Sequence, residues 1–298
     1  MTPARTACLC ALALALTAAA PPSFAPWIAG TTASEPQTQV QRIDADTFVI
    51  RQSVQTNFEA PFLYLIFGTD RALLIDTGAG GLKIRPAVEA VIADWLKANN
   101  RASIPLVVAH SHSHGDHHAG DSEFAGRPDT QVVGLLPTEV AAFFGVANWP
   151  QDIATFDLGG RPLSIIPTPG HQPAHIMVWD PRTTLLFSGD MLYPGRLYVP
   201  VDRFPAFVAS ADRLAAFSAS HPVSAALGAH IEMTNTPGKD YAHEAPVHAD
   251  EHPLALPPDA ITRLQATAHA MAAGPVLPGA NVNAGDFIIV PVPLRKEP

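Results

Sequence analysis

The chain has 298 residues, of which 47% are hydrophobic and 15% are charged, and it contains 30 prolines. A chain of this length and composition can bury a sizeable core, which excludes a disordered protein and a small disulfide-stabilised scaffold. Its formal net charge of -9 at pH 7 repels a phosphate backbone, so we do not expect nucleic acid as a partner.

Residues 1–25 have the pattern of a secretory signal peptide. Arg5 supplies a positive charge, residues 7–20 are small or apolar, and Ser23-Phe24-Ala25 resembles a cleavage site. This segment predicts a periplasmic or secreted protein. The apolar run is too short to span a bilayer, so we expect no membrane anchor after export. Both cysteines of the chain lie inside the segment, so the exported protein would carry no thiol and no disulfide.

Residues 26–38 are polar and contain proline, and we expect them to form a loose leader. Order is expected to begin near Val40. Because no internal repeat or low-complexity linker interrupts the remaining chain, residues 39–298 are predicted to form a single domain of mixed α/β type.

Apolar runs predict the strands of this domain, and apolar residues at helical spacing predict its helices. In chain order, the expected strands are Thr47–Ile50, Phe62–Phe67, Ala72–Ile75, Ile104–Ala109, Gln131–Leu135, Leu163–Ile166, His175–Trp179, Thr184–Phe187, Ser224–Leu227 and Phe287–Val292. The expected helices are Leu82–Lys97, Pro137–Phe144, Phe207–Ser218 and Ala260–Met271. Pro291 and Pro293 place the last strand at a sheet edge, because proline cannot donate to a ladder.

The most informative stretch is the histidine-rich segment 110–118, which follows a predicted strand. It contains an H-x-H-x-D-H pattern at His112, His114, Asp116 and His117. Residues two apart in an extended segment project to the same side, so His112 and His114 can hold one ion. Asp116 and His117 lie on the next turn and can hold a second ion nearby. Imidazole and carboxylate are the ligands expected of zinc in a cysteine-free site.

A tract rich in histidine could instead be a flexible segment that binds metal incidentally. Against this alternative, three further ligand residues stand singly at the ends of predicted strands. They are His171 in Thr-Pro-Gly-His, Asp190 in Phe-Ser-Gly-Asp and His230 in Gly-Ala-His. Loops at strand ends are where a rigid scaffold usually presents reactive groups.

Together with Asp76 in Leu-Ile-Asp-Thr-Gly, these motifs resemble the metallo-β-lactamase superfamily in order and approximate spacing, over about Val40 to His230. Within the superfamily, the pattern is most similar to that of the lactonase and glyoxalase II-type members. The resemblance implies an αβ/βα sandwich of two mixed sheets flanked by helices, with metals between loops at one edge. It also implies that Asp76 supports the site from behind the ligands.

The resemblance assigns seven side chains to two zinc ions. The first ion would be held by His112, His114 and His171, the second by Asp116, His117 and His230, and Asp190 would bridge the two. Two cations about 3.5 to 4 Å apart lower the pKa of a water between them to about 7, which supplies a hydroxide nucleophile. The leading hypothesis is therefore an exported dinuclear zinc hydrolase that acts on a small ester, lactone, thioester or amide.

Two residues are predicted to act in catalysis beside the metals. Asp116 could help the leaving group to depart. Tyr193, three residues after Asp190, is similar to a tyrosine that lactonases of this superfamily place against the substrate carbonyl, although a packed core aromatic is the alternative.

The loop 232–256 after His230 could form a lid or pocket wall and carries Tyr241. Glu232 is expected to point away from the metals. Arg196 could bind a substrate carboxylate, with a surface arginine as the alternative.

Three other functions are weighed against the zinc hydrolase. Export favours a metallo-β-lactamase that acts on β-lactams, but those enzymes usually carry Cys or Ser where this chain has Asp190. A mononuclear iron enzyme of the persulfide dioxygenase type would use His112, His171 and Asp190, so iron could replace zinc. A non-catalytic metal-binding protein is opposed by the intact set of ligands. The expected partner is a small-molecule substrate, and the sequence does not predict the oligomeric state.

Overall fold

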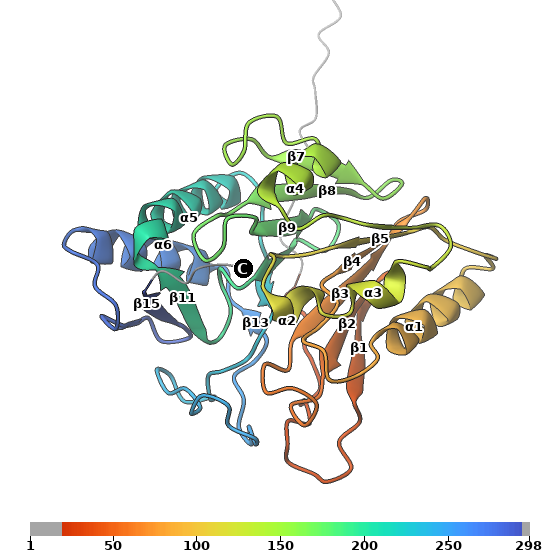
Figure 1. The fold of residues 1–298 in the computed structure, drawn as a ribbon, viewed down its shortest axis with the longest axis horizontal. Helices are drawn as coiled ribbons and strands as arrows, with labels where there is room; N and C mark the ends of the chain where they lie inside the picture. The colour runs from red at the N-terminus through yellow and green to blue at the C-terminus, as the bar shows by residue number, and fades with distance from the viewer. Residues whose placement is uncertain (1–19, 294–298) are drawn as a thin grey trace, which may run out of the picture.

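The computed structural model describes residues 20–293 (Figure 1). The signal peptide predicted for residues 1–25 lies mostly outside this range. Within residues 20–293, no helix combines the length and the apolar character that crossing a membrane requires.

The first sheet has the strand order β1-β2-β3-β4-β5-β6. Its strands are β1 (Thr38–Asp44), β2 (Thr47–Gln52), β3 (Phe62–Phe67), β4 (Ala72–Ile75), β5 (Leu106–Ala109) and β6 (Thr130–Val132). The second sheet has the order β13-β12-β10-β9-β8-β7. Its strands are β7 (Ala154–Asp157), β8 (Pro162–Pro167), β9 (Ile176–Asp180), β10 (Leu185–Gly189), β12 (Ala225–Gly228) and β13 (Ala255–Leu256).

A third, smaller sheet has the order β11-β15-β14. Its strands are β11 (Arg196–Pro200), β14 (Val282–Asn283) and β15 (Ile288–Val292). The helices are α1 (Arg85–Ala98), α2 (Gly115–His118), α3 (Asp121–Phe124), α4 (Pro137–Phe144), the 3₁₀ turn η1 (Val201–Arg203), α5 (Phe204–Ser218) and α6 (Asp259–Ala272).

The two large sheets form the middle layers of the molecule, and helices cover their outer faces (Figure 1). The side chains of β3 explain this layered arrangement, because alternate residues of a strand face opposite sides of the sheet. Phe62, Tyr64 and Ile66 pack in the core between the sheets, whereas Leu63 and Leu65 pack beneath α1. The helices α5 and α6 pack on the second sheet and on β11. The predicted αβ/βα sandwich is confirmed.

A buried ion pair ties the two large sheets together. Arg161, between β7 and β8, donates to the Asp180 carboxylate at 2.6 Å, and the two side chains are 2% and 0% exposed. The same guanidinium donates to the Phe67 carbonyl at 3.0 Å and to the Thr47 hydroxyl at 2.6 Å, both in the first sheet. All of these bonds form where water is excluded, so the pair fixes the relative position of the sheets.

The segment expected to be a loose leader is packed. The ring of Trp27 lies 5.1 Å from that of Phe62, and Ala29 is fully buried. The backbone of Ile28 bonds with the Gln39 side chain at 2.8 and 2.7 Å. The polar composition of the segment gave no sign of this packing, because only the Trp27 ring and the Gln39 side chain hold the segment in place.

The prediction that the last strand lies at a sheet edge is wrong, because β15 lies between β11 and β14. β14 pairs only with Ile288 and Ile289. Farther along, the Pro291 carbonyl accepts a hydrogen bond from the N–H of Gly279 at 2.9 Å. In a strand, the N–H and the carbonyl of one residue point to the same side. The N–H that Pro291 lacks would therefore point toward β14, but beyond its end, so no hydrogen bond between β15 and β14 is lost.

Candidate metal centre

The candidate ligands come together because several strands end at the same place. β4 runs parallel to β5, and their carboxyl ends lead to Asp76 and to the histidine-rich segment. β10 runs parallel to β12, and their carboxyl ends lead to Asp190 and His230. His171 lies in the loop between β8 and β9. In Figure 1, α2 lies near the centre of the molecule between the two sheets, as expected for a site at strand ends.

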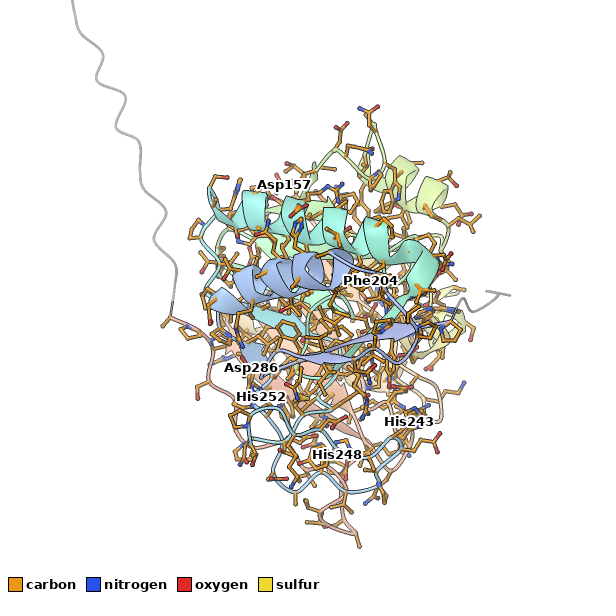
Figure 2. All side chains as sticks on the ribbon, turned by 90° about the vertical axis from the view of Figure 1, so that its left-hand side faces the viewer. Asp157, Phe204, His243, His248, His252 and Asp286 are labelled. Atoms are coloured by element: carbon orange, nitrogen blue, oxygen red, sulfur yellow. The ribbon has the colours of Figure 1, made fainter. Side chains whose placement is uncertain are left out.

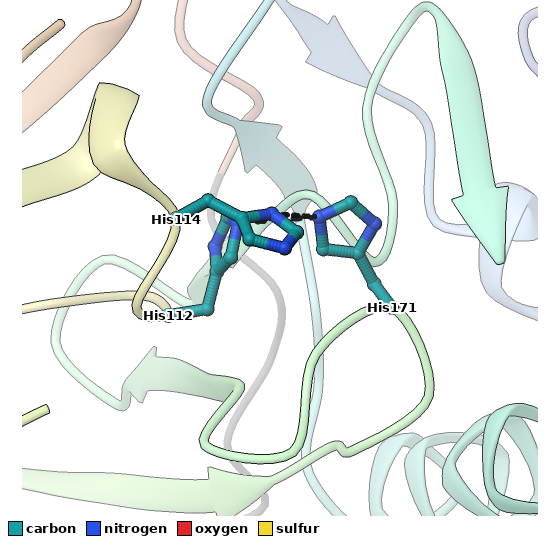
Figure 3. A group of neighbouring side chains, drawn as sticks. All are labelled: His112, His114 and His171. Atoms are coloured by element: carbon teal, nitrogen blue, oxygen red, sulfur yellow. Dashed lines mark hydrogen bonds between the residues drawn. The ribbon is translucent and has the colours of Figure 1, made fainter. Parts of the chain in front are cut away.

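Three imidazole rings form the first cluster, which consists of His112, His114 and His171 (Figure 3). The His114 Nδ1 atom lies 2.9 Å from the Nε2 atoms of both other rings, and those two Nε2 atoms are 3.2 Å apart. A neutral ring nitrogen either donates or accepts, so the three contacts between these nitrogens cannot all be hydrogen bonds. Tetrahedral zinc with Zn–N bonds of about 2.0–2.1 Å needs nitrogens about 3.3–3.4 Å apart, close to this triangle.

The first cluster is neutral near physiological pH. Burial lowers the pKa of His114 to about 4. Burial also lowers the pKa of His112 well below its usual range and lowers the pKa of His171. Neutral imidazoles keep a lone pair for a cation, so this cluster needs no loss of protons before it binds a metal.

The second cluster consists of Asp116, His117, Asp190 and His230. The Asp116 Oδ2 atom lies 3.0 Å from His117 Nε2 and 3.4 Å from His230 Nε2. Asp190 Oδ1 lies 3.6 and 3.4 Å from the same two nitrogens. This oxygen is buried and has no hydrogen-bond partner in the described residues, which fits a carboxylate placed to bind a cation.

The Asp190 carboxylate joins the two clusters. Its other oxygen, Oδ2, lies 3.6 Å from His171 Nε2 and 4.0 Å from His112 Nε2. One oxygen therefore faces each cluster, so a single carboxylate could contact two cations.

The second cluster carries charged side chains, unlike the neutral first cluster. Burial opposes the charged forms, but the neighbouring carboxylates outweigh it and raise the pKa of His117 and His230 well above their usual range. The same histidines overcome burial and hold the pKa of Asp116 and Asp190 well below theirs. Without a bound cation this cluster is a set of ion pairs, so a metal must displace protons from its histidines.

Contacts behind the clusters orient the rings. The Tyr198 carbonyl accepts from His171 Nδ1 at 2.6 Å, and the Glu59 carbonyl accepts from His230 Nδ1 at 2.8 Å. The Asp76 carboxylate lies 2.9 Å from His117 Nδ1. A carbonyl only accepts, so the single ring proton of neutral His171 or His230 lies on Nδ1. The Nε2 atom of each ring then faces its cluster with a lone pair that can bind a cation. Asp76 thus lies behind a candidate ligand of the second cluster.

A cavity of about 490 Å³ opens beside the clusters. Five candidate ligands face it, together with side chains from four other regions of the chain. The latter include Glu59, Tyr198, Arg203, Glu232, His243 and Val292. Figure 2 shows His243 and His248 on the same side of the molecule, on the long segment that follows β12.

Tyr193 lines this cavity, but its hydroxyl already has protein partners. It lies 2.5 Å from the Arg196 carbonyl and 3.0 Å from the Glu232 carboxylate, while its ring packs 5.6 Å from that of His230. Burial raises the pKa of Tyr193 well above its usual range. This geometry favours a positioning role, and contact with a substrate stays a prediction.

Arg196 pairs with protein carboxylates, and its side chain is partly buried, with 14% exposed. Its guanidinium bonds to Glu232 at 2.7 Å and to Asp240 at 2.8 Å, and it also donates to the Tyr241 carbonyl at 2.7 Å. The Tyr241 hydroxyl donates to Asp250 at 2.7 Å. Arg196 therefore fastens the segment after His230 to β11.

Two acidic residues of the cavity were missed. Glu232 was expected to point away from the metals, yet it lines the cavity. Residues two apart in an extended segment project to the same side, so its spacing from His230 carried the signal. Glu59 has no such signal, because 171 positions separate it from the histidine that its carbonyl holds.

Comparison with known proteins identifies the family. The Metallo-beta-lactamase superfamily profile matches residues 57–217, slightly more than half of the chain, so the chain belongs to this superfamily. It is similar to the acyl-coenzyme A thioesterase MBLAC2 of Bos taurus, with 30% identity over 185 residues that cover 51% of this chain and 66% of that protein. It is also similar to a hydroxyacylglutathione hydrolase of Rhizobium meliloti (strain 1021), with 32% identity over 91 residues, 30% of this chain and 35% of that protein.

These matches span less than two thirds of the length of either relative. Among solved structures, that of TMB-1 aligns with a TM-score of 0.50 and 16% identity, over 80% of this chain and 99% of that chain. At this identity the likeness supports the fold alone.

Proposed function

We propose that this protein is a dinuclear zinc hydrolase that cleaves a small ester, lactone, thioester or amide. The observation that carries the proposal is the Asp190 carboxylate, whose two oxygens face two separate groups of metal-ligand side chains. Membership of the metallo-β-lactamase superfamily supports it, as do relatives named as a thioesterase and a hydrolase.

The proposed ligands are the side chains of the two clusters. His112, His114 and His171 would hold the first ion, Asp116, His117 and His230 the second, and Asp190 both. All are imidazole or carboxylate groups, the set that zinc prefers where cysteine is absent. An iron centre that used only His112, His171 and Asp190 would leave the second cluster without a role, so we favour a dinuclear centre.

Bound zinc ions would supply a water of lowered pKa and would polarise the carbonyl of the substrate. The protein's own groups then set geometry and move protons. The Asp116 side chain is 23% exposed and faces the cavity, so it is placed to pass a proton to the leaving group. Tyr193 could reach a substrate carbonyl only by exchanging its present bonds, so its contribution is to hold Glu232 and to pack against His230.

A metal count combined with a substrate screen tests the proposed function. We expect zinc near two per chain and hydrolysis of aryl esters, lactones or thioesters faster than of β-lactams. Asp190→Asn should lose both metal and turnover. Asp212→Asn is the matched control, because Asp212 also pairs with a histidine, His269 at 2.7 Å, but does not line the cavity.

Other outcomes of this experiment would contradict the proposal. Iron near one per chain with consumption of oxygen would indicate a dioxygenase. Faster turnover of β-lactams would indicate a β-lactamase.

We also propose export to the periplasm or beyond the cell, on the pattern of the first 25 residues. N-terminal sequencing of the protein from the producing cell should give a chain that starts after Ala25. An intact N-terminus in the cytoplasmic fraction would contradict export.

A further inference from the structure

Glu59 is a cavity-lining carboxylate on a well-fixed loop between β2 and β3. The Asn57 side chain accepts from the Glu59 N–H at 2.9 Å and donates to the Ala79 carbonyl at 3.0 Å. The Glu59 carbonyl holds His230 at 2.8 Å. The backbone of Glu59 is therefore anchored beside the second cluster, while its side chain faces the cavity.

Glu59 and Glu232 line the same cavity but differ in their partners. Glu232 accepts from the Arg196 N–H and guanidinium at 2.7 Å each and from the Tyr193 hydroxyl at 3.0 Å. In residues 20–293, the charged neighbours that act most strongly on the Glu59 carboxylate are His230 and three other carboxylates. No hydrogen bond or ion pair between described residues engages its oxygens. Glu232 is thus satisfied internally, whereas Glu59 is left to meet a ligand.

A partly buried carboxylate without a donor has lost part of its hydration and has gained no hydrogen bond in return. A ligand N–H would restore that bond, and a cationic nitrogen would do so most strongly. An anionic group in the same place would be repelled. Sites that hydrogen-bond one substrate group also reject analogues that lack it.

We propose that Glu59 selects substrates that carry a cationic, hydrogen-bond-donating nitrogen near the scissile bond. The inference rests on the proposed function, because it takes the cavity as the active site of a hydrolase. It narrows the substrate class to small amine-bearing esters, thioesters or amides.

Two matched series of aryl esters test the proposal on the zinc-loaded full chain. In the first series, phenyl esters carry a 3-aminopropanoyl, butanoyl or malonyl group, which places an ammonium, methyl or carboxylate group on the acyl side. In the second series, acetates of 4-aminomethylphenol, 4-ethylphenol and 4-carboxymethylphenol place the same three kinds of group on the leaving side. Each kcat/KM is divided by the rate constant for hydroxide-catalysed hydrolysis, which removes differences in intrinsic reactivity.

The expected result is a preference for the ammonium ester over its uncharged isostere of about 10- to 100-fold in at least one series, the size of one charge-assisted hydrogen bond. Glu59→Gln should bring this ratio close to one. Glu244→Gln is the matched control and should keep the ratio, because Glu244 is exposed on the neighbouring segment and does not line the cavity.

The outcomes separate this inference from the proposed function. Hydrolysis of the esters without an ammonium preference would overturn the inference alone, and wild-type protein suffices to show it. A preference that survives in Glu59→Gln would also overturn it. Faster turnover of the carboxylate esters would do the same and would point to Arg203, which lines the same cavity. If no ester is hydrolysed, the inference fails, and the metal count with the wider substrate screen decides the proposed function separately.

Discussion

Asp76→Asn should weaken metal binding at the second cluster without replacing a candidate ligand. The Asp76 carboxylate is 2% exposed and accepts from the Ser111 N–H at 2.7 Å and the Ser111 hydroxyl at 2.9 Å. It also lies 2.9 Å from His117 Nδ1. An asparagine has only one acceptor oxygen, so its amide N–H₂ must face one of these donors.

The size of the effect follows from these contacts. If the amide oxygen stays on the Ser111 N–H, the charge-assisted bond to His117 is lost, which costs about 1.5–3 kcal/mol of unfolding free energy. His117 also loses the group that orients its ring, and loss of such a partner typically lowers metal affinity about 10- to 100-fold. We therefore expect the second ion to bind more weakly by that factor, while the affinity for the first ion changes little.

Competition titrations with a zinc chelator measure both affinities, and urea unfolding measures stability. Asp121→Asn is the matched control, because Asp121 also supports a histidine, His110 at 2.8 Å, that belongs to neither cluster. It should cost stability but leave both metal affinities unchanged. Wild-type affinity for the second ion in Asp76→Asn, or an equal loss in Asp121→Asn, would refute the reasoning.

Three further predictions follow from the same structure. The pKa of His117 and His230 is raised, whereas that of His114 is lowered to about 4, so protons compete with a metal more strongly in the second cluster than in the first. Acidification should therefore release the ion of the second cluster before that of the first. Metal content measured after dialysis across pH 4–8 checks this, and simultaneous release of both ions would contradict it. Arg161→Met leaves the Asp180 carboxylate buried without its partner, and urea unfolding should show a loss of about 3–5 kcal/mol, whereas a loss below 1 kcal/mol would contradict the role of the pair. Tyr193→Phe should lower kcat less than about tenfold, because its hydroxyl already serves Glu232 and Arg196; a loss of 100-fold or more in kinetic assays, the scale of an oxyanion donor, would instead favour contact with the substrate.

Local patterns predicted the strands that build the core. β3 is six apolar residues long and was predicted with its observed bounds, because a buried strand needs a short apolar run. β11 was not predicted, because Arg196–Pro200 lies between the strand predicted at Thr184–Phe187 and the helix predicted at Phe207–Ser218, where no further element was expected. It forms a strand by pairing in parallel with β15, a partner that follows much later in the chain and that no local window contains.

The candidate ligands were predictable because they stand in short motifs at strand ends, as His112 and Asp190 do. The groups around them were less so. The bond that anchors Glu59 to His230 joins two loops, and the Arg161 pair joins two sheets. Such contacts depend on the final packing of the layers, which residue spacing does not encode.

Metal stoichiometry tests the central claim most directly. Zinc bound per chain is measured by elemental analysis after equilibration of the full chain, His114→Ala and His230→Ala, and anomalous diffraction locates the ions. The account predicts two ions in the wild type and one in each variant, with His114→Ala keeping the ion near His230 and His230→Ala keeping the ion near His112. A wild type that binds one ion or none, or two variants that lose the same ion, would contradict it.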